Sequence, residues 1–457
     1  MPSLVGSEMC IRDRVVTTRR ETDGSFFVSA KVYDVYRETT AKPEPADEEH
    51  LVLSVTLYRL LSGILGFAPP WGVLYGVRPA KLMHRLCAQM GDDAAVAHFQ
   101  TAFLTQKSKA ELAHEVMLHE NRSIARSGPK SFSLYVSIPF CPTRCAYCSF
   151  VSHSIEKTHK LMTPYVNLLL RELEETAKYT KELGLELATV YFGGGTPTTL
   201  SAQDLGRIFS TIEQNFDLSH LMEYTVEAGR PDTVTRERLE VIRAAGVQRI
   251  SINPQSFNDK VLEAIGRRHT AQQTLDAFAL ARDCGFDHIN MDFIAGLPED
   301  DLPSFQRSIQ TALDLQAESI TVHTLALKTS AYMVTREQTF DLKDRLTVSN
   351  MVDYAGQTLH GAGYYPYYMY RQSKSLGNLE NVGWCKPGYD CLYNVYMMDE
   401  THTVLAVGAG AVTKLRGQNS GMIQRIYNYK YPYEYIRDFD TLLERKKRIP
   451  GFYAEYD

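Results

Sequence analysis

The chain has 457 residues, of which 44% are hydrophobic, and its formal net charge is −5. Because acidic and basic residues are interspersed, this composition gives no basic footprint for nucleic acid or for an anionic membrane, and neither is expected as a partner. No apolar run reaches the length of a membrane span, and eight cysteines without a signal-peptide pattern are typical of a reducing compartment, so we expect a cytoplasmic protein of two or three domains.

The N-terminal part divides into a tail and a mixed segment. Residues 1–14 include the run SLVGSEMCIRDR, which looks like a translated sequencing adapter, so we interpret them as an artefactual tail. Residues 15–127 begin with two strand-like runs, VVTTRRE and FFVSAKVYDVYRET, and continue with helical periodicity. We predict an N-terminal α+β domain here, and we assign no chemical role to its Arg78 or Lys81.

Three cysteines stand close together after a short apolar strand. The run SIPFCPTRCAYCSF holds Cys141, Cys145 and Cys148 at C-x-x-x-C-x-x-C spacing. Three such thiolates can share one soft metal centre, and because iron–sulfur clusters normally take four protein ligands, a local set of three predicts a 4Fe–4S cube with one open iron. The alternative that the spacing leaves open is structural zinc with His153 as fourth ligand.

The other cysteines carry weaker signals. Cys87 and Cys284 are scattered and are expected to be core residues. Cys385 and Cys391, in CKPGYDC, lie across a Pro-Gly turn that could bring their sulfurs together, so a ligand role for this pair stays open although the spacing is not a tight metal-binding one.

Residues 128–330 repeat one unit, a short strand followed by an amphipathic helix. The strand-like runs are SLYVSIP, LATVYF, EYTVEA, VQRISI, HINMDFIA and SITVHT. Strands alternating with helices imply parallel pairing, and six units predict an α/β fold with a partial (β/α)6 barrel. A polar or glycine-rich motif follows every strand, so we expect these motifs to converge at one mouth formed by the carboxyl ends of the strands.

Residues 331–457 are expected to form a C-terminal extension on the substrate side. They contain a helical run, the tyrosine-rich GYYPYYMYRQ, a glycine-rich hairpin and turn over ENVGWCKPGYDCLYN and LAVGAGAVTKL, and a single amphipathic helix near the end. The tyrosine faces would suit a flat ligand edged with carboxylates, with Tyr368 and Arg371 as candidate binding residues. A core strand whose hydroxyls reach a rim is the alternative interpretation.

These motifs carry a family resemblance. The cysteine spacing, with Phe140 before it and Tyr147 between the last two cysteines, resembles the radical S-adenosylmethionine (SAM) signature, in which the open iron chelates SAM. The string YVSIPFC...CAYCSF, with YFGGGTPT and NMDFIAGLP, is similar to the oxygen-independent coproporphyrinogen III oxidase (dehydrogenase) family over about residues 131–330. The late segments GYYPYYMYRQ, ENVGWCKPG and CLYN resemble its HemZ branch.

The resemblance implies a set of SAM-contacting positions. Matched residue by residue, they are Tyr135, Tyr147, Gly194, Gly195, Thr196, Glu227, Gln255, Arg267, Asp292 and Ala326. Enzymes of the founding type bind two SAM molecules, but Ser137 stands where their pattern has histidine, which leaves open whether one or two bind here.

The resemblance also implies an activity. The expected reaction is the oxidative decarboxylation of coproporphyrinogen III to protoporphyrinogen IX in haem biosynthesis, by a SAM-derived 5'-deoxyadenosyl radical, with no side chain assigned as catalytic. Reduced flavodoxin or ferredoxin is the expected electron donor, and the protein is expected to be a monomer. Because the Asp-His pair of the founding enzymes is absent from the tyrosine-rich region, two alternatives stay open: a haem-binding carrier or chaperone, and a radical SAM enzyme that modifies haem.

Overall fold

The computed structural model describes residues 14–45, 48–149, 153–326, 342–372 and 374–457. Most of the predicted artefactual tail and the predicted boundary near residue 330 therefore lie outside the described residues. In the described parts of the chain, no helix is long and apolar enough to cross a membrane.

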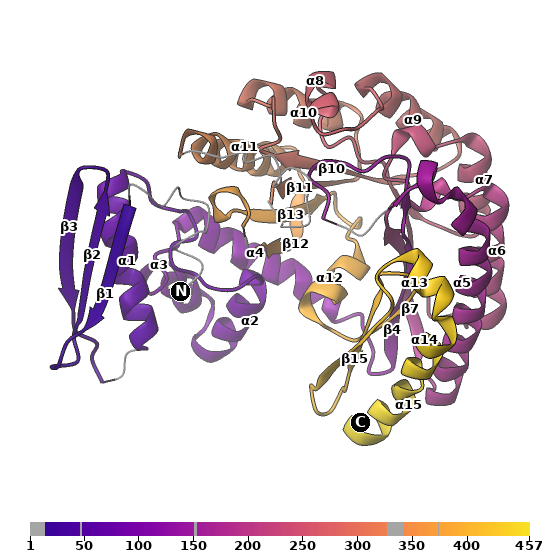
Figure 1. The fold of residues 1–457 in the computed structure, drawn as a ribbon, viewed down its shortest axis with the longest axis horizontal. Helices are drawn as coiled ribbons and strands as arrows, with labels where there is room; N and C mark the ends of the chain where they lie inside the picture. Colours follow the sequence, from indigo (N-terminus) through magenta and orange to yellow (C-terminus); the bar gives the residue numbers. More distant parts are fainter. Residues whose placement is uncertain (1–13, 46–47, 150–152, 327–341, 373) are drawn as a thin grey trace.

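The N-terminal end forms a small sheet that lies at one extremity of the molecule (Figure 1). Its three antiparallel strands are β1 (Arg14–Arg20), β2 (Phe26–Val32) and β3 (Val35–Ala41). The second predicted run is a hairpin and not one strand, because Tyr33 turns the chain with a φ of 52°. Alternate side chains of β2 pack against Leu57 and Leu61 of helix α1 (Glu49–Leu65).

Three further helices connect this sheet to the rest of the molecule. They are α2 (Pro79–Met90), α3 (Asp92–Thr101) and α4 (Lys107–Ile124). Two side chains of this region donate to the buried carboxylate of Glu380. Trp71, which precedes α2, donates from Nε1 at 2.6 Å, and Lys109 of α4 donates from Nζ at 2.6 Å. The N-terminal helices are thus joined to the C-terminal part of the chain by buried polar contacts.

One large sheet organises the remainder. Its strands are β4 (Ser131–Ile138), β7 (Glu186–Gly194), β8 (Glu223–Glu227), β9 (Arg249–Ser251), β10 (His288–Ala295), β11 (Ser319–Thr324), β12 (Tyr365–Arg371), β13 (Glu380–Cys385), β14 (Thr403–Val407), β15 (Val412–Arg416) and β16 (Ile423–Tyr427). Their order is β12-β13-β11-β10-β9-β8-β7-β4-β14-β15-β16. The neighbours from β11 through to β14 are parallel, and the flanking strands run antiparallel.

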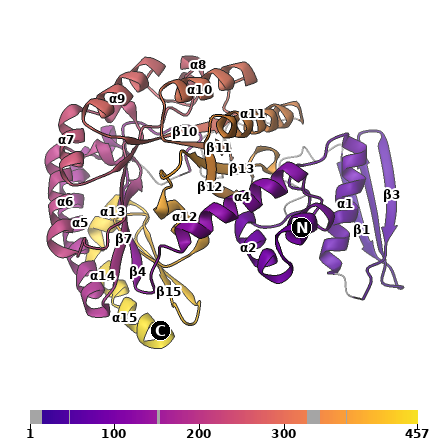
Figure 2. The same cartoon turned by 180° about the vertical axis from the view of Figure 1, so that it is seen from behind.

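Helices cover the outer face of the parallel strands (Figures 1 and 2). They are α5 (Ile155–Leu183), α6 (Ala202–Asn215), α7 (Arg236–Ala244), α8 (Asp259–Ala264), α9 (Ala271–Asp283), α10 (Leu302–Asp314) and α11 (Leu342–Gly361). Short 3₁₀ turns lie at Pro197–Thr199, Pro231–Thr233 and Leu376–Asn378. All six predicted strand and helix units are present, and β12 and β16 are the edges of the sheet within the described residues. The predicted partial (β/α)6 barrel is confirmed.

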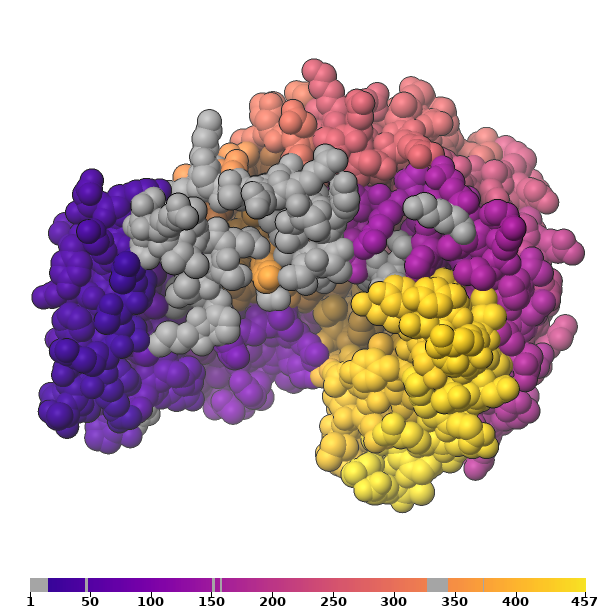
Figure 3. Space-filling model, viewed as in Figure 1, coloured from indigo at the N-terminus to yellow at the C-terminus, as the bar shows by residue number. Residues whose placement is uncertain are grey.

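The C-terminal part supplies the flanking strands and four helices. The helices are α12 (Leu392–Asp399), α13 (Pro432–Arg437), α14 (Phe439–Lys446) and α15 (Arg448–Tyr456). The predicted single terminal helix is wrong, because Asp438 leaves helical geometry between α13 and α14. The predicted hairpin over ENVGWCKPGYDCLYN is also wrong, since β13 is followed directly by α12. Figure 3 shows the last residues, in yellow, at the surface of the barrel and far from the indigo N-terminal sheet.

Candidate active site

A cavity of about 850 Å³ lies on the inner side of the large sheet. Side chains along each strand alternate between its two faces, so every second residue of the parallel strands lines this cavity. On β9 and the segment that follows it, Arg249, Ser251, Asn253 and Gln255 face inward in this way. This strand therefore supplies polar side chains to the interior of the barrel.

The three clustered cysteines follow β4, and the first of them ends the short strand β5 (Phe140–Cys141). Cys141, Cys145 and Cys148 all line the cavity. The Thr196 hydroxyl donates to Cys141 Sγ at 3.5 Å, and Arg230 Nη1 donates to Cys145 Sγ at 3.8 Å. Each of these two sulfurs therefore faces a hydrogen-bond donor. Because none of the described cysteines forms a disulfide, the three sulfurs fit the predicted iron–sulfur cluster.

The structure gives the zinc alternative no support. The His153 ring packs against the rings of Tyr431 and Tyr433, with centroids 5.7 and 6.5 Å away, and it does not line the cavity. Cys385 and Cys391 are both fully buried in an apolar and aromatic cluster. Burial raises the pKa of each thiol, which disfavours a ligand role for the pair.

The glycine-rich loop after β7 runs directly beside the cysteine loop. Gly195 N–H donates to the Ile138 carbonyl at 2.7 Å, and Thr196 N–H donates to the Phe140 carbonyl at 2.7 Å. A Cβ on Gly195 would lie 2.6 Å from that Phe140 oxygen, and Gly194 has a φ of 102°. Glycine is therefore required here for backbone to approach backbone.

All ten residues matched to SAM-contacting positions line this cavity. Several buried polar atoms around it have no hydrogen-bond partner among the described residues, namely Arg267 Nε, Asn253 Oδ1 and two guanidinium nitrogens of Arg249, Nε and Nη1. Because buried polar atoms are nearly always hydrogen-bonded, unpartnered donors and an acceptor facing one cavity fit a polar ligand such as SAM.

Two carboxylates in the cavity differ in charge state. Burial raises the pKa of Glu227 to about 7, although Tyr191 Oη donates to its carboxylate at 2.6 Å. Burial acts in the same sense on Asp292, but hydrogen bonds from His323 and Asn290 outweigh it and hold the pKa below its usual value. Asn290 donates to Asp292 at 2.7 Å. Near neutral pH, Asp292 is ionised and Glu227 is half-titrated.

An aromatic wall forms another side of the cavity. Tyr393, from α12, stacks on Tyr191 at 4.4 Å between centroids and on Tyr135 at 5.9 Å. Across the sheet, Tyr368 and Tyr370 stack at 6.3 Å and also line the cavity. Sequence reasoning missed Tyr191 and Tyr393. Tyr191 could have been found from the two-residue period of β7, whereas nothing local indicates Tyr393.

Arg371, the second predicted substrate residue, does not line the cavity. Its guanidinium donates to the Leu74 carbonyl at 2.9 Å and to the Asn378 carbonyl, and it lies 5.3 Å from the Trp71 ring. Residues three apart in a strand face opposite sides, so Tyr368 and Arg371 point apart. The placement favours a structural role in which Arg371 holds the N-terminal segment against β12.

Ser137, the position of interest for a second SAM, is buried. Its hydroxyl donates to the Ala409 carbonyl at 2.7 Å, and its own carbonyl accepts from Tyr165 Oη at 2.7 Å. It does not line the cavity. Ser137 therefore joins the end of β4 to the turn after β14.

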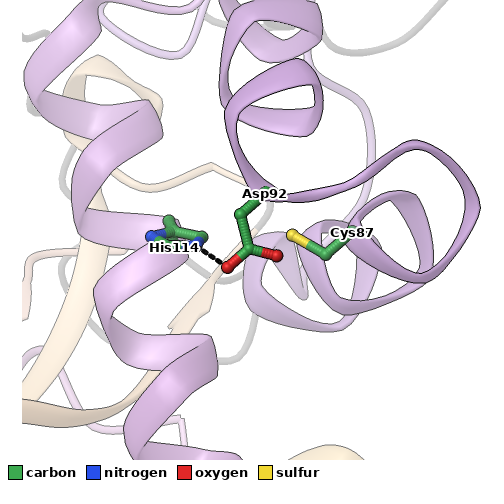
Figure 4. A group of neighbouring side chains, drawn as sticks. All are labelled: Cys87, Asp92 and His114. Atoms are coloured by element: carbon green, nitrogen blue, oxygen red, sulfur yellow. Dashed lines mark hydrogen bonds and ion pairs between the residues drawn. The ribbon is translucent and has the colours of Figure 1, made fainter.

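A separate group of polar side chains joins α2, α3 and α4 (Figure 4). The Asp92 carboxylate lies between the Cys87 thiol and the His114 ring, whose Nε2 is 2.9 Å from it, and all three ligand-type atoms lie within 4.8 Å of one another. Burial and the Asp92 charge raise the pKa of Cys87 to about 11, so the thiol stays protonated. None of the three lines the cavity, and we assign them a structural role in joining the helices.

Known proteins resemble this chain over the segment that contains the three cysteines and most of the cavity. The radical SAM superfamily model matches residues 135–312. The chain is 36% identical to the oxygen-independent coproporphyrinogen-III oxidase-like protein HemZ of Bacillus subtilis, over 86% of this chain and 79% of that protein. It is 30% identical to the heme chaperone HemW of B. subtilis, over 68% and 79%.

A solved structure has a similar fold. Coproporphyrinogen III oxidase (HemN) from Escherichia coli matches with a TM-score of 0.53 and 21% identity, over 71% of this chain and 72% of that one. Identity at this level supports the fold alone.

Proposed function

Because the chain belongs to the oxygen-independent coproporphyrinogen III oxidase family of the radical SAM superfamily, in its HemZ branch, we propose that it decarboxylates coproporphyrinogen III oxidatively to protoporphyrinogen IX. The cofactors of the chain are a 4Fe–4S cluster and SAM. When bound and reduced, they supply the one-electron chemistry for removing a hydrogen atom from a propionate side chain. The observation that carries the proposal is that one cavity joins the cysteine triad to a wall of tyrosines.

In our proposal, different residues bind the cluster, bind SAM and exclude water. Cys141, Cys145 and Cys148 hold the cluster, and the ten matched positions hold one SAM molecule. Glu227 and Asp292 accept hydrogen bonds from its ammonium or ribose hydroxyl groups. Arg267 donates to Tyr147 Oη at 3.2 Å and to the Asn253 carbonyl, which fixes its guanidinium toward the cavity. The buried aromatic walls exclude water from the reacting centre.

The C-terminal extension supplies the substrate side of the cavity in this proposal. We divide the chain into an N-terminal domain over 15–127, a barrel over 128–330 and an extension over 331–457. The division is supported by the lining residues from β12, α12, β15 and β16, among them Tyr368, Tyr393 and Lys414. We further propose that the protein acts as a monomer in the cytoplasm, with reduced flavodoxin or ferredoxin as its donor.

SAM affinity should depend on the charge of Glu227. Since the pKa of Glu227 is raised to about 7, its carboxylate gains a proton as pH falls and can no longer accept two hydrogen bonds. We expect SAM affinity to fall about tenfold from pH 8 to pH 6, measured by anaerobic equilibrium titration of reconstituted protein.

The Glu227→Gln protein is the matched control for that titration. It should bind SAM more weakly at pH 8 and show a flatter profile, because only titration of SAM itself remains. Equal slopes in the two proteins would show that Glu227 does not contact SAM.

The activity is tested with reconstituted protein, SAM, dithionite and coproporphyrinogen III under anaerobic conditions. We expect release of carbon dioxide and a monovinyl tripropionate intermediate before the divinyl product, because each propionate must be presented in turn to one radical source. Tyr368→Leu should lower vinyl formation about tenfold or more while SAM cleavage without substrate persists. Tyr365→Leu, on the same strand but outside the cavity, should affect vinyl formation far less.

A second candidate function rests on the similarity to the heme chaperone HemW. The same cavity, with its tyrosine walls, would hold haem in a carrier that does not decarboxylate. If the reconstituted protein forms no vinyl product but binds haem tightly and passes it to an apo-haemoprotein, this candidate replaces the first. Consumption of haem in a SAM-dependent reaction would instead indicate a haem-modifying enzyme.

A further inference from the structure

Four cationic side chains surround one carboxylate beside the cavity. Glu400, just after α12, lies 2.5 Å from Arg78, 3.6 Å from Lys81, 3.4 Å from Lys414 and 3.2 Å from Arg425. We call the four cations the Glu400 cation cluster. They come from three separate regions of the chain, since Arg78 and Lys81 stand at the start of α2 and the other two on β15 and β16.

The positive charge of this cluster is only partly neutralised. Among the described residues, Glu400 is the one carboxylate within ion-pair distance of these cations. The neighbouring Asp399 adds a second negative charge, although its carboxylate accepts from the Thr401 hydroxyl and it meets Lys81 through its main-chain oxygen. Four positive charges therefore face two negative ones.

Lys414 is the most buried member of the cluster, with 12% of its side chain exposed. Burial lowers its pKa even though Glu400 acts in the opposite sense, and the charges of Arg78 and Arg425 lower it further. The pKa of Glu400 itself falls to about 2, because its hydrogen bond to Arg78 and the surrounding cations outweigh the effect of its burial. A second anion beside Lys414 would thus be stabilised.

The strand register sets two like charges opposite each other. Lys414 on β15 pairs directly with Arg425 on β16. Like charges at directly opposed positions of an antiparallel pair destabilise it. Glu400 Oε1 lies within ion-pair distance of both side chains and offsets part of that cost, and a second anion would offset more of it. Both side chains line the same cavity as the three cysteines, and Lys414 is 12% exposed.

The same register places this cluster well away from the cysteines. Lys414 pairs with Val404 of β14, which pairs with Ser133 near the start of β4, whereas Cys141 follows the end of β4. Along β4 alone, the five residues from Ser133 to the strand end at Ile138 span about 17 Å at the usual rise per residue, and the cysteines lie beyond that end. A large substrate can therefore place one carboxylate among the cations while another part faces the cysteines.

We propose that Lys414 and Arg425, supported by Arg78 and Lys81, bind a carboxylate of the substrate that is not reacting. The inference rests on the proposed function in one respect, namely that the substrate is a tetrapyrrole with several carboxylates. In this proposal the Glu400 cation cluster selects carboxylated over uncharged macrocycles. It also orients the macrocycle in the cavity. The cluster gives the N-terminal segment a supporting role, because Arg78 and Lys81 form ion pairs with Glu400 from there and so compete with Lys414 and Arg425 for its charge.

The test is equilibrium binding of coproporphyrin III, the oxidised and stable tetracarboxylic form, followed by its absorbance and fluorescence. The reconstituted wild-type protein should bind it at least about tenfold more tightly than the uncharged tetramethyl ester. The Lys414→Gln/Arg425→Gln protein should bind the acid at least about tenfold more weakly than wild type, and should bind acid and ester nearly alike. Lys414→Arg, which keeps the charge, should retain most of the preference for the acid.

Controls separate charge recognition from folding. Lys430→Gln/Arg437→Gln removes two cations of the same C-terminal segment that do not line the cavity, and should leave acid binding unchanged. Iron content and circular dichroism of the double variant should match wild type. If a folded Lys414→Gln/Arg425→Gln protein binds the acid as tightly as wild type, or loses acid and ester binding equally, the proposal is overturned.

The outcome is distinguishable from failure of the proposed function. If wild type forms vinyl product and the Lys414→Gln/Arg425→Gln protein binds porphyrin as wild type does, the proposed carboxylate site is contradicted and the decarboxylase proposal is not. Charge-selective porphyrin binding that is lost in the double variant, without any vinyl formation by wild type, would contradict the decarboxylase proposal and leave the carboxylate site supported.

Discussion

Replacing Cys145 with alanine should remove most iron and sulfide from anaerobically prepared protein and lower SAM cleavage by more than about 100-fold, beyond the usual effect of an outer-shell change. In the proposed site each of the three thiolates ligates one iron, so two of them would not hold the cluster. Cys145 is 8% exposed and lies in a loop fixed by the hydrogen bond from Ala146 N–H to the Ile265 carbonyl, at 2.9 Å. The substitution should therefore leave the fold intact. Iron and sulfide analysis with anaerobic deoxyadenosine formation measures the effect.

The matched control for that variant is Cys385→Ala. Cys385 is also buried, but it lies in the apolar and aromatic cluster and does not line the cavity. Its replacement should leave iron content and SAM cleavage close to wild type. Iron retained by the Cys145→Ala protein, together with iron lost from the Cys385→Ala protein, would refute the ligand assignment.

Replacing Lys446 with methionine should lower the free energy of unfolding by roughly 3–5 kcal/mol, because it leaves the carboxylate of Glu172 buried without its counter-charge. Lys446 Nζ lies 2.6 Å from Glu172, and the two side chains are 1% and 0% exposed. The same carboxylate accepts from Tyr435 Oη at 2.6 Å and from Gly408 N–H at 2.8 Å. Urea denaturation of the protein under anaerobic conditions measures the loss.

This ion pair also supports the cysteine loop. Gly408 begins a turn in which the Ala409 carbonyl accepts a hydrogen bond from the Ser137 hydroxyl. Ser137 lies near the end of β4, the strand that leads to the cysteines. We therefore expect the Lys446→Met protein to lose iron at lower urea concentrations than wild type. The neighbouring Lys447→Met is the control. Lys447 is 62% exposed, and within the part of the chain that the structure describes its ion pair is with Glu444, so its replacement should cost less than about 0.5 kcal/mol. Equal losses in the two variants would contradict the role of the buried pair.

The double variant Lys446→Met/Glu172→Gln adds a further check. It removes both charges and keeps an amide that can still accept from Gly408 N–H. It should recover part of the stability lost in Lys446→Met, because the cost arises from the uncompensated charge and not from the lost contact itself. No recovery would show that packing, and not charge, dominates at this site.

Local patterns in the sequence were sufficient to predict the segment that contains the three clustered cysteines and to predict the partial barrel. The cysteine spacing is a property of eight consecutive residues, and each strand and helix of the barrel shows its own hydrophobic period. The close approach at Gly194 and Gly195 was likewise indicated by three consecutive glycines, since a run of that kind is needed where backbones meet. The two-residue period of β12 would also have shown that Tyr368 and Arg371 face opposite sides. The prediction that both bind one ligand did not take this period into account.

The fold class, the family and the proposed metal ligands could be predicted from the sequence, because they depend on patterns among near neighbours in the chain. The side chains that surround the ligands could not be predicted in this way, because the folding of distant segments brings them there. Tyr393 stacks on Tyr191 because α12 packs inside the barrel, and Glu400 gathers Arg78 from 322 residues away in the chain, together with Lys414 and Arg425. Such neighbours share no local pattern, since the free energy that brings them together comes from burial of the whole sheet and its helices and not from any one segment.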